Sequence, residues 1–252
     1  MAALFLFFGC NSENAPISSG PPPSPTAVPT PQYVKLHYLP GIVPGSQKSL
    51  APQKVGVAPI TGENVSGTVV IGGVYNPDLS ISPEIKIVDA GEQLREALIA
   101  ALADAGLEAV KVDTPKEKQP LPDDLRYVLE PKLWDLRTEK RLSNRVTVHG
   151  RYFTMKSMVT LKFSYIDSQG RLAHEVTTTG VEEEPPPPKG GEEFLPLETD
   201  PQESLSVAMS RAFGQMITDP DNKGLFRRGA APLVTPAPGS VTFGGPPPAT
   251  KH

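Results

Sequence analysis

The chain has 252 residues and a formal net charge of -4 with both signs interspersed, so it lacks the basic stripe that nucleic-acid binding needs. Its single cysteine excludes an intrachain disulfide, and its four histidines lack the spacing of metal ligands, so we expect no metal and no cofactor. The histidines are His37, His149, His174 and His252.

Proline divides the chain into a folded part and two tails. Of the 30 prolines, ten lie in residues 11–52, six in 183–201 and seven in 220–252. Such stretches bury too little apolar surface to fold. We therefore expect a disordered Pro/Ser-rich linker over 11–52, one domain over 53–220 and a disordered Pro/Gly-rich tail over 221–252.

The N-terminus carries a short apolar run ahead of the lone cysteine. Residues 4–8 are apolar, and Gly9 and Cys10 follow. Five residues cannot cross a bilayer, which takes about 20, but they fit the end of a signal peptide's apolar region. Gly9-Cys10 resembles the bacterial lipobox, in which a small residue precedes the cysteine that receives a diacylglycerol. By this resemblance residues 1–10 are a shortened lipoprotein signal whose true start lies upstream, and Cys10 is the lipidation site.

The alternative for Cys10 is an incidental free thiol, although a cysteine ahead of a Pro-rich stretch has no core to be buried in. Two or three acyl chains, palmitate among them, would anchor the protein stably to a membrane. Asn11 follows the cysteine where lipoproteins retained at the inner membrane carry aspartate. The lipobox resemblance therefore implies an outer-membrane lipid anchor with the domain facing the periplasm.

The first half of the domain predicts strands and one helix. Residues 54–60 and 68–75 alternate as strands, and Gly72-Gly73 fits a hairpin turn or a bulge. Asp89 and Glu92 form a capping-box pattern before a helix that Gly106 ends, and residues 107–112 alternate as a strand. Residues 32–43 alternate less regularly, so an edge strand or a docking peptide is possible there, but a loosely packed linker is favoured.

The second half predicts an antiparallel meander. Strands are expected over 125–136, 145–166 and 171–181, with a turn at 167–170 and a solvated acidic loop over 182–193. The alternation in the second of these strands places on one side Met155, Val159, Leu161, Phe163 and Tyr165. A second helix begins at Asp200, with Pro201 in its first turn and Glu203 completing a capping box. Its apolar stripe consists of Leu205, Ala208, Met209, Ala212, Phe213 and Met216. The fold class is therefore α+β, an α/β two-layer sandwich whose mainly antiparallel sheet carries two helices on one face.

Catalytic motifs are missing from the sequence. There is no GxSxG elbow and no phosphate-binding glycine loop, and the lone cysteine is assigned to the anchor. His149 and His174 lie on expected strands at positions that we interpret as exposed. We therefore expect a protein that is not an enzyme.

The order of elements resembles small bacterial envelope lipoproteins. The phrases are VGVAPI, GEQLREALIAALADAGLEAV, DLRYVLEPKLWDL and LSVAMSRAF, behind the lipobox. They are similar to the YajG-like lipoproteins and the auxiliary lipoproteins of ABC-type transport systems, and more distantly to lipopolysaccharide-assembly lipoproteins. The resemblance implies a lipid-anchored, periplasm-facing component that binds an envelope protein partner in a transport or outer-membrane assembly complex.

Two other functions stay open at this point. The domain is a lipid- or glycan-binding protein if a cavity lies between helices and sheet, lined by Met155, Met158, Met209 and Phe213. A cell-surface spacer is also compatible with the long tails. A filled core with an exposed apolar edge would favour a protein partner over a small ligand.

Overall fold

The computed structural model describes residues 29–48, 50, 52–75, 81–113, 121–122, 124–147, 150–183 and 200–226. Within these ranges nine strands form one sheet, accompanied by three helices. The strands are β1 (Gln32–Val34), β2 (Lys54–Val57), β3 (Thr61–Gly62), β4 (Thr68–Tyr75), β5 (Ile81–Val88), β6 (Glu108–Lys111), β7 (Tyr127–Thr147), β8 (Gly150–Asp167) and β9 (Leu172–Glu183). The helices are α1 (Ala90–Asp104), α2 (Pro201–Thr218) and α3 (Pro220–Leu225). No helix in the described residues is long and apolar enough to cross a membrane.

The long strand β7 organises the sheet. On one side it pairs antiparallel with β8, which pairs antiparallel with β9, as the predicted meander requires. On the other side β2, β3 and β4 pair with β7 in succession, and all three run parallel to it. The sheet is thus mixed, whereas the sequence led us to expect a mainly antiparallel one. The difference arises because strands far apart in the sequence align with β7 through crossovers rather than hairpins.

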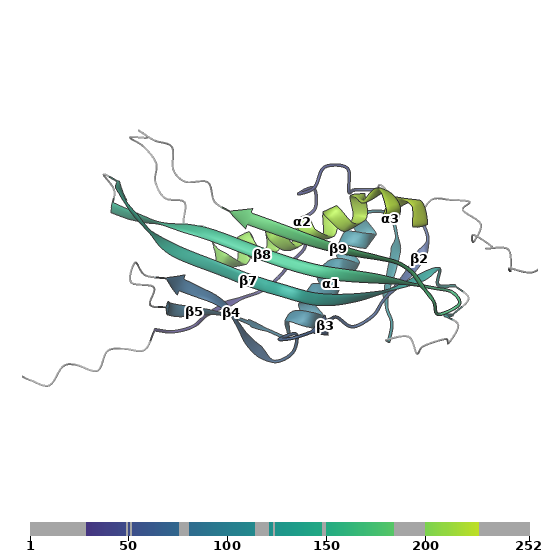
Figure 1. Ribbon diagram of the computed structural model, residues 1–252, viewed down its shortest axis with the longest axis horizontal. Coiled ribbons are helices and arrows are strands. Elements are labelled where there is room, and N and C mark those ends of the chain that lie inside the picture. Colours follow the sequence, from purple (N-terminus) through teal and green to yellow (C-terminus); the bar gives the residue numbers. More distant parts are fainter. Residues whose placement is uncertain are drawn as a thin grey trace, which may run out of the picture.

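The strands β7, β8 and β9 run along the length of the molecule, with α1 and α2 on the same side of them (Figure 1). The predicted alternation of β8 is confirmed, because Met155, Val159, Leu161, Phe163 and Tyr165 are all buried. They form the inner side of the sheet, against which the apolar sides of both helices pack. The intervening residues face away from the helices.

Helix α1 is confirmed, but its predicted capping box is wrong. Asp89 adopts a left-handed conformation, with φ of 49°, and makes no side-chain cap bond to the helix. Its carboxylate instead accepts a hydrogen bond from the N–H of Gly67 at 2.8 Å, and Gly91 N–H donates to the carbonyl of Val65 at 2.7 Å. The preceding loop therefore supplies the partners that a capping box would have supplied.

Helix α2 begins as the sequence predicts and lies directly on β9. The carboxylate of Asp200 accepts a hydrogen bond from Gln202 N–H at 3.0 Å, which is the expected N-cap contact. Its predicted apolar stripe is fully buried. At Gly180 of β9 the helix comes so close that a Cβ atom would overlap the carbonyl oxygen of Ala208. The absence of a side chain at Gly180 thus sets the distance between helix and sheet.

Residues 32–48 belong to the folded domain, so the predicted linker ends earlier than position 52. β1 pairs parallel with β5, and the chain then crosses both helices. It contacts α2 at successive turns of the helix, where Lys35 N–H donates to Gln202 Oε1, His37 N–H to Ser206 Oγ and Leu39 N–H to Ser210 Oγ. Val43 then covers Gly214. We name residues 35–48 the strap. Polar side chains on the helices accept hydrogen bonds from backbone N–H groups of the strap. The amino-acid composition of residues 35–48 does not reveal these contacts.

The strap is also held to α1 by the phenol of Tyr38, which donates a hydrogen bond to Asp104 Oδ2 at 2.9 Å. Burial, together with this hydrogen bond, raises the pKa of Tyr38 to about 12. The usual pKa of tyrosine is about 10, so the folded state holds this proton more tightly than the unfolded state. The contribution to stability is complete below pH of about 10 and is lost as the pH rises toward about 12.

We therefore expect wild-type protein to lose more stability between pH 9 and pH 11 than Tyr38→Phe, which has no phenol to ionise. Denaturant unfolding at both values measures the difference, and the comparison cancels titrating groups common to both proteins, including Tyr165. Equal losses in the two proteins would show that the phenol ionises in the folded state as easily as in water.

The domain also extends beyond position 220 at its C-terminal end. Residues 221–226, expected in a disordered tail, include most of α3 and the buried ring of Phe226. This ring makes edge-to-face contacts with Tyr127 and Tyr165, each with centroids 5.8 Å apart. The side chain of Asp219 caps α3 by accepting hydrogen bonds from two backbone N–H groups. The predicted tail beyond residue 226 lies outside the described residues.

Candidate functional site

On the side of β7, β8 and β9 that faces away from the helices, side chains of the three strands line up in register. We name this side the outer face. The register of the three strands places one residue from each strand side by side, and we call each such set a row. In the first row Glu130 of β7 faces Ser164 of β8, which faces Glu175 of β9. The rows continue along the strands as Lys132, Lys162 and Thr177, then Asp135, Thr160 and Thr179, then Arg137, Met158 and Val181, then Glu139, Lys156 and Glu183.

Trp134 is the large apolar residue of the outer face. Trp134, the only tryptophan of the chain, is 56% exposed, whereas a large apolar side chain is usually buried in a folded domain. The ammonium of Lys162 lies 5.9 Å from the centroid of the indole ring, a cation–π arrangement. Aromatic residues ringed by polar groups are typical of protein interfaces.

The charges around Trp134 are largely neutralised within the chain. Lys162 Nζ lies 2.7 Å from Glu175 Oε1, and Ser164 Oγ donates to the same oxygen at 3.0 Å. Hydrogen bonds from Lys162 and Ser164 lower the pKa of Glu175, so this carboxylate stays charged. Glu130, at the other end of the row, has its pKa raised by burial. The outer face therefore presents hydrogen-bonding groups held in place by their partners, rather than a strong electrostatic potential of one sign.

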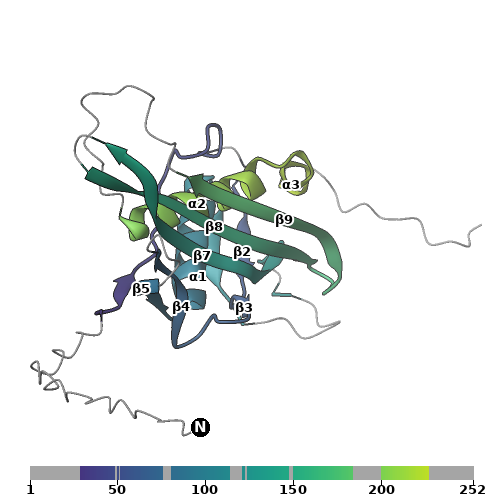
Figure 2. The same ribbon diagram turned by 60° about the vertical axis from the view of Figure 1, so that its left-hand side comes forward.

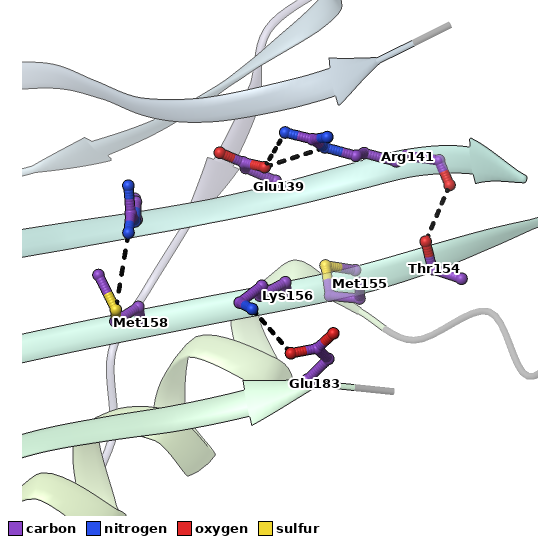
Figure 3. Close-up of a pocket in the computed structure, with 8 residues that line it drawn as sticks. Glu139, Arg141, Thr154, Met155, Lys156, Met158 and Glu183 are labelled. Carbon is purple, nitrogen blue, oxygen red and sulfur yellow. Dashed lines mark hydrogen bonds and ion pairs between the residues drawn. The ribbon is translucent and has the colours of Figure 1, made fainter. Parts of the chain in front are cut away.

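A hollow of about 590 Å³ lies where the outer face approaches the far end of β7 and β8. Two ion pairs border it, Glu139 with Arg141 at 2.7 Å and Lys156 with Glu183 at 2.8 Å (Figure 3). Arg137 Nη2 donates to the sulfur of Met158 at 3.7 Å, and both residues line the hollow. The residues that line the hollow provide polar contacts and two thioethers, and none of the contacts between them pairs a nucleophile with a base.

The four residues assigned from the sequence to one cavity do not line one together. Met209 and Phe213 are fully buried, and the ring of Phe213 contacts Phe163 edge-to-face at 6.4 Å. Met155 and Met158 both line the hollow at the strand ends, but Met155 points inward and Met158 outward. The space between the helices and the sheet at Met209 and Phe213 is filled by core packing.

The other residues singled out in the sequence are dispersed. Cys10, His149 and His252 lie outside the described residues. His37 is exposed on the strap, with its Nδ1 3.3 Å from Ser206 Oγ. The interpretation of His174 as an exposed strand residue is wrong, because its Nε2 is buried and its ring lies 5.9 Å from that of Tyr165.

A cluster of buried hydroxyls escaped the sequence analysis. Thr138 and Ser157 hydrogen-bond to each other at 2.7 Å, and Ser204 of α2 donates to Ser157 at 2.8 Å. None of these hydrogen bonds involves a histidine or a carboxylate, so the cluster supplies no activated nucleophile. It joins α2 to β7 and β8, and it depends on the pairing of these two strands and on the packing of the helix against them, which the sequence alone does not give.

Comparison with known proteins yields likenesses in structure alone. No family model matches the chain, and no curated protein matches its sequence. Similar solved structures include a Xanthomonas campestris protein of the family DUF330, with 12% identity, 78% of this chain and 95% of that chain covered, and a TM-score of 0.41. A PelC dodecamer from Paraburkholderia phytofirmans has 17% identity, coverage of 70% and 88%, and a TM-score of 0.36. Lipoprotein GNA1162 from Neisseria meningitidis has 14% identity, coverage of 55% and 89%, and a TM-score of 0.29. All three TM-scores are below 0.5, so these likenesses carry no weight in assigning a function.

Proposed function

We propose that this protein is a lipid-anchored, periplasm-facing and non-catalytic component of a bacterial envelope complex, serving transport or outer-membrane assembly. The observation that carries the proposal is the outer face, where Trp134 stands 56% exposed among ion-paired side chains. Burying such an aromatic residue is a major source of affinity in protein–protein interfaces. The partner is therefore an envelope protein that covers the indole.

The filled core supports a protein partner over an enclosed lipid or glycan. Met209 and Phe213, which would line a ligand cavity, are instead buried against the sheet. The hollow at the strand ends is bordered by two ion pairs, Glu139 with Arg141 and Lys156 with Glu183, as well as by Met155 and Met158. An acyl chain would leave these charges without water, which is costly, whereas the polar rim of a protein interface tolerates them.

The lipid anchor makes weak binding sufficient. Residues 11–31 separate Cys10 from β1, and they would span at most roughly 70 Å. Confinement within such a distance of the membrane raises the effective concentration of the domain near membrane-bound partners, to about the millimolar range. Because the strap is folded, this tether is shorter than the predicted linker over 11–52.

The anchor is tested by replacing Cys10. In the native host, we expect the wild-type chain to begin at Cys10 with added acyl chains by intact mass and to fractionate with membranes. Cys10→Ala is expected to lack the added mass and to lose membrane association at least tenfold, because no acyl chain remains to be buried. Unmodified mass and identical fractionation of the two proteins would refute the lipoprotein proposal.

The same host tests the outer face as the binding surface. A photoreactive amino acid at Trp134 is expected to crosslink one discrete envelope protein, and the yield should fall at least tenfold when Cys10→Ala is added. The matched control is the same amino acid at Gln215, which is exposed on α2 away from the outer face. Equal products at both positions would show that the outer face is not the site.

A further inference from the structure

Strand β9 has no partner strand on one of its two edges among the described residues. Among the described strands it pairs with β8 alone, and it lies at the margin of the sheet (Figure 2). It has 12 residues, whereas the other described strands with a single partner are shorter: β1 has three residues, β3 two and β6 four. An edge of this length presents a row of backbone N–H and C=O groups that can pair with another strand.

The sequence of β9 lacks the residues that usually protect an edge strand, and in the described residues Arg211 of α2 covers the edge only at the carbonyl of Val181. The β9 sequence, LAHEVTTTGVEE, contains no lysine, arginine or proline. Its three glutamates are each paired within the chain, Glu175 with Lys162, Glu182 with Arg211 and Glu183 with Lys156. The stretch between Glu175 and Glu182 is uncharged, so electrostatic repulsion does not oppose an approaching strand.

The direction of the free backbone groups follows from Arg211 of α2, which donates a hydrogen bond to the carbonyl of Val181. Successive residues of an antiparallel strand direct their N–H and C=O groups to opposite neighbours in turn. A Val181 carbonyl open to Arg211 thus indicates that Thr177 and Thr179 also direct their backbone groups away from β8. Both of these residues are exposed.

Two buried polar atoms on β9 lack hydrogen-bond partners in the described part of the chain. Thr178 is only 6% exposed, and its Oγ1 bonds to nothing; the same holds for Nε2 of His174. A buried polar atom without a partner costs roughly 1 to 3 kcal/mol, so native proteins rarely leave two on one strand. Both atoms lie on the same strand as the open edge.

We propose that β9 pairs antiparallel with β9 of a second copy of this chain, about a two-fold axis at Thr178. In this register each Thr178 faces its counterpart, where two hydroxyls can hydrogen-bond to each other. His174 then faces Glu182 of the other copy, so the second unpartnered atom meets a carboxylate. Glu175 faces Val181 and Glu183 faces Ala173, so no like charges stand opposite each other.

The pairing is isologous, because the same edge serves both copies, and the assembly closes as a dimer. It leaves the outer face open on both copies, so it is compatible with the proposed function and does not depend on it. Facing residues of antiparallel strands have Cα atoms about 4.5 to 5.5 Å apart, within the range that a disulfide spans. A cysteine at Thr178 therefore reports the register directly.

The test uses the full chain carrying Cys10→Ala, so that an introduced cysteine is the only thiol. Under mild oxidation we expect Thr178→Cys to form a disulfide-linked dimer of about twice 26.9 kDa, at least tenfold faster than Thr177→Cys. The comparison is sharp because Thr177 is exposed and Thr178 is buried. Random collisions would favour the exposed position, whereas the two-fold pairing favours the buried one.

A second variant keeps the proposal testable if the cysteine disturbs the core. Thr177→Pro removes one N–H from the free edge and leaves the pairing with β8 intact. By sedimentation we expect the unoxidised parent protein to be dimeric at 50 µM and Thr177→Pro to be monomeric, both with the same circular dichroism spectrum. A monomeric parent, equal crosslinking at positions 177 and 178, or a dimer unaffected by Thr177→Pro would each overturn the proposal.

Discussion

Phe226→Ala is expected to lower the free energy of unfolding by about 3 to 5 kcal/mol. The ring is 1% exposed and fits between Tyr127 and Tyr165, whose ring centroids both lie 5.8 Å from its own. Truncation removes apolar contacts and leaves a cavity beside two aromatic rings that the sheet holds in place. The loss is large because β7 and β8 fix these rings and cannot move to fill the space.

Urea or guanidinium unfolding followed by circular dichroism measures the change, and Leu172→Ala is the control. Leu172 is 58% exposed, so its truncation should change stability by no more than about 0.5 kcal/mol. A loss below about 1 kcal/mol for Phe226→Ala would contradict the packing of the chain after Asp219. It would then support the sequence-based prediction of a disordered tail from residue 221.

Gly180→Ala is expected to destabilise the protein by about 3 kcal/mol, although it adds a single methyl group. That methyl would overlap the carbonyl oxygen of Ala208 and approach the backbone nitrogen of Ala212 to 2.6 Å. Both atoms belong to the backbone of α2, so no side-chain rotation relieves the overlap. The helix must move away from β9, which disturbs the buried contacts of Met209 and Phe213.

The control for this prediction is Gly224→Ala in α3, where an added Cβ meets nothing within 4 Å. Alanine favours helix more than glycine does, so the control is expected to be neutral or stabilising by up to about 1 kcal/mol. Thermal unfolding of the three proteins side by side gives the comparison. Equal stabilities of Gly180→Ala and Gly224→Ala would mean that α2 does not lie as close to β9 as described.

Elements with strong local signals were predicted well. The leucines and alanines of α1 repeat at helical spacing and end at Gly106, whose φ is indeed positive at 104°. The alternation from Met155 to Tyr165 gave the buried side of β8 correctly, because a strand with one wet side alternates strictly. The bulges at Gly72-Gly73 were one of two predicted alternatives and are confirmed.

Elements that depend on distant partners were missed. No strand was assigned to residues 81–88, where Pro83 interrupts the pattern, yet Ile85 and Ile87 of β5 are fully buried between β1 and β4. The strap was interpreted as linker because its sequence is rich in proline. Its backbone is satisfied by Gln93, Gln202 and Ser210, which lie on helices more than 50 residues away in the chain.

The sequence by itself determined α1, α2, the meander and the lipobox resemblance at Cys10, since each rests on neighbouring residues or on a short period. Only the tertiary structure decided the parallel pairing of β2, β3 and β4 with β7, the exposure of Trp134 and the open edge of β9. These features depend on which segments meet across long stretches of chain. Local periodicity fixes which side of an element is apolar, but the partner that covers that side is chosen by packing of the whole domain.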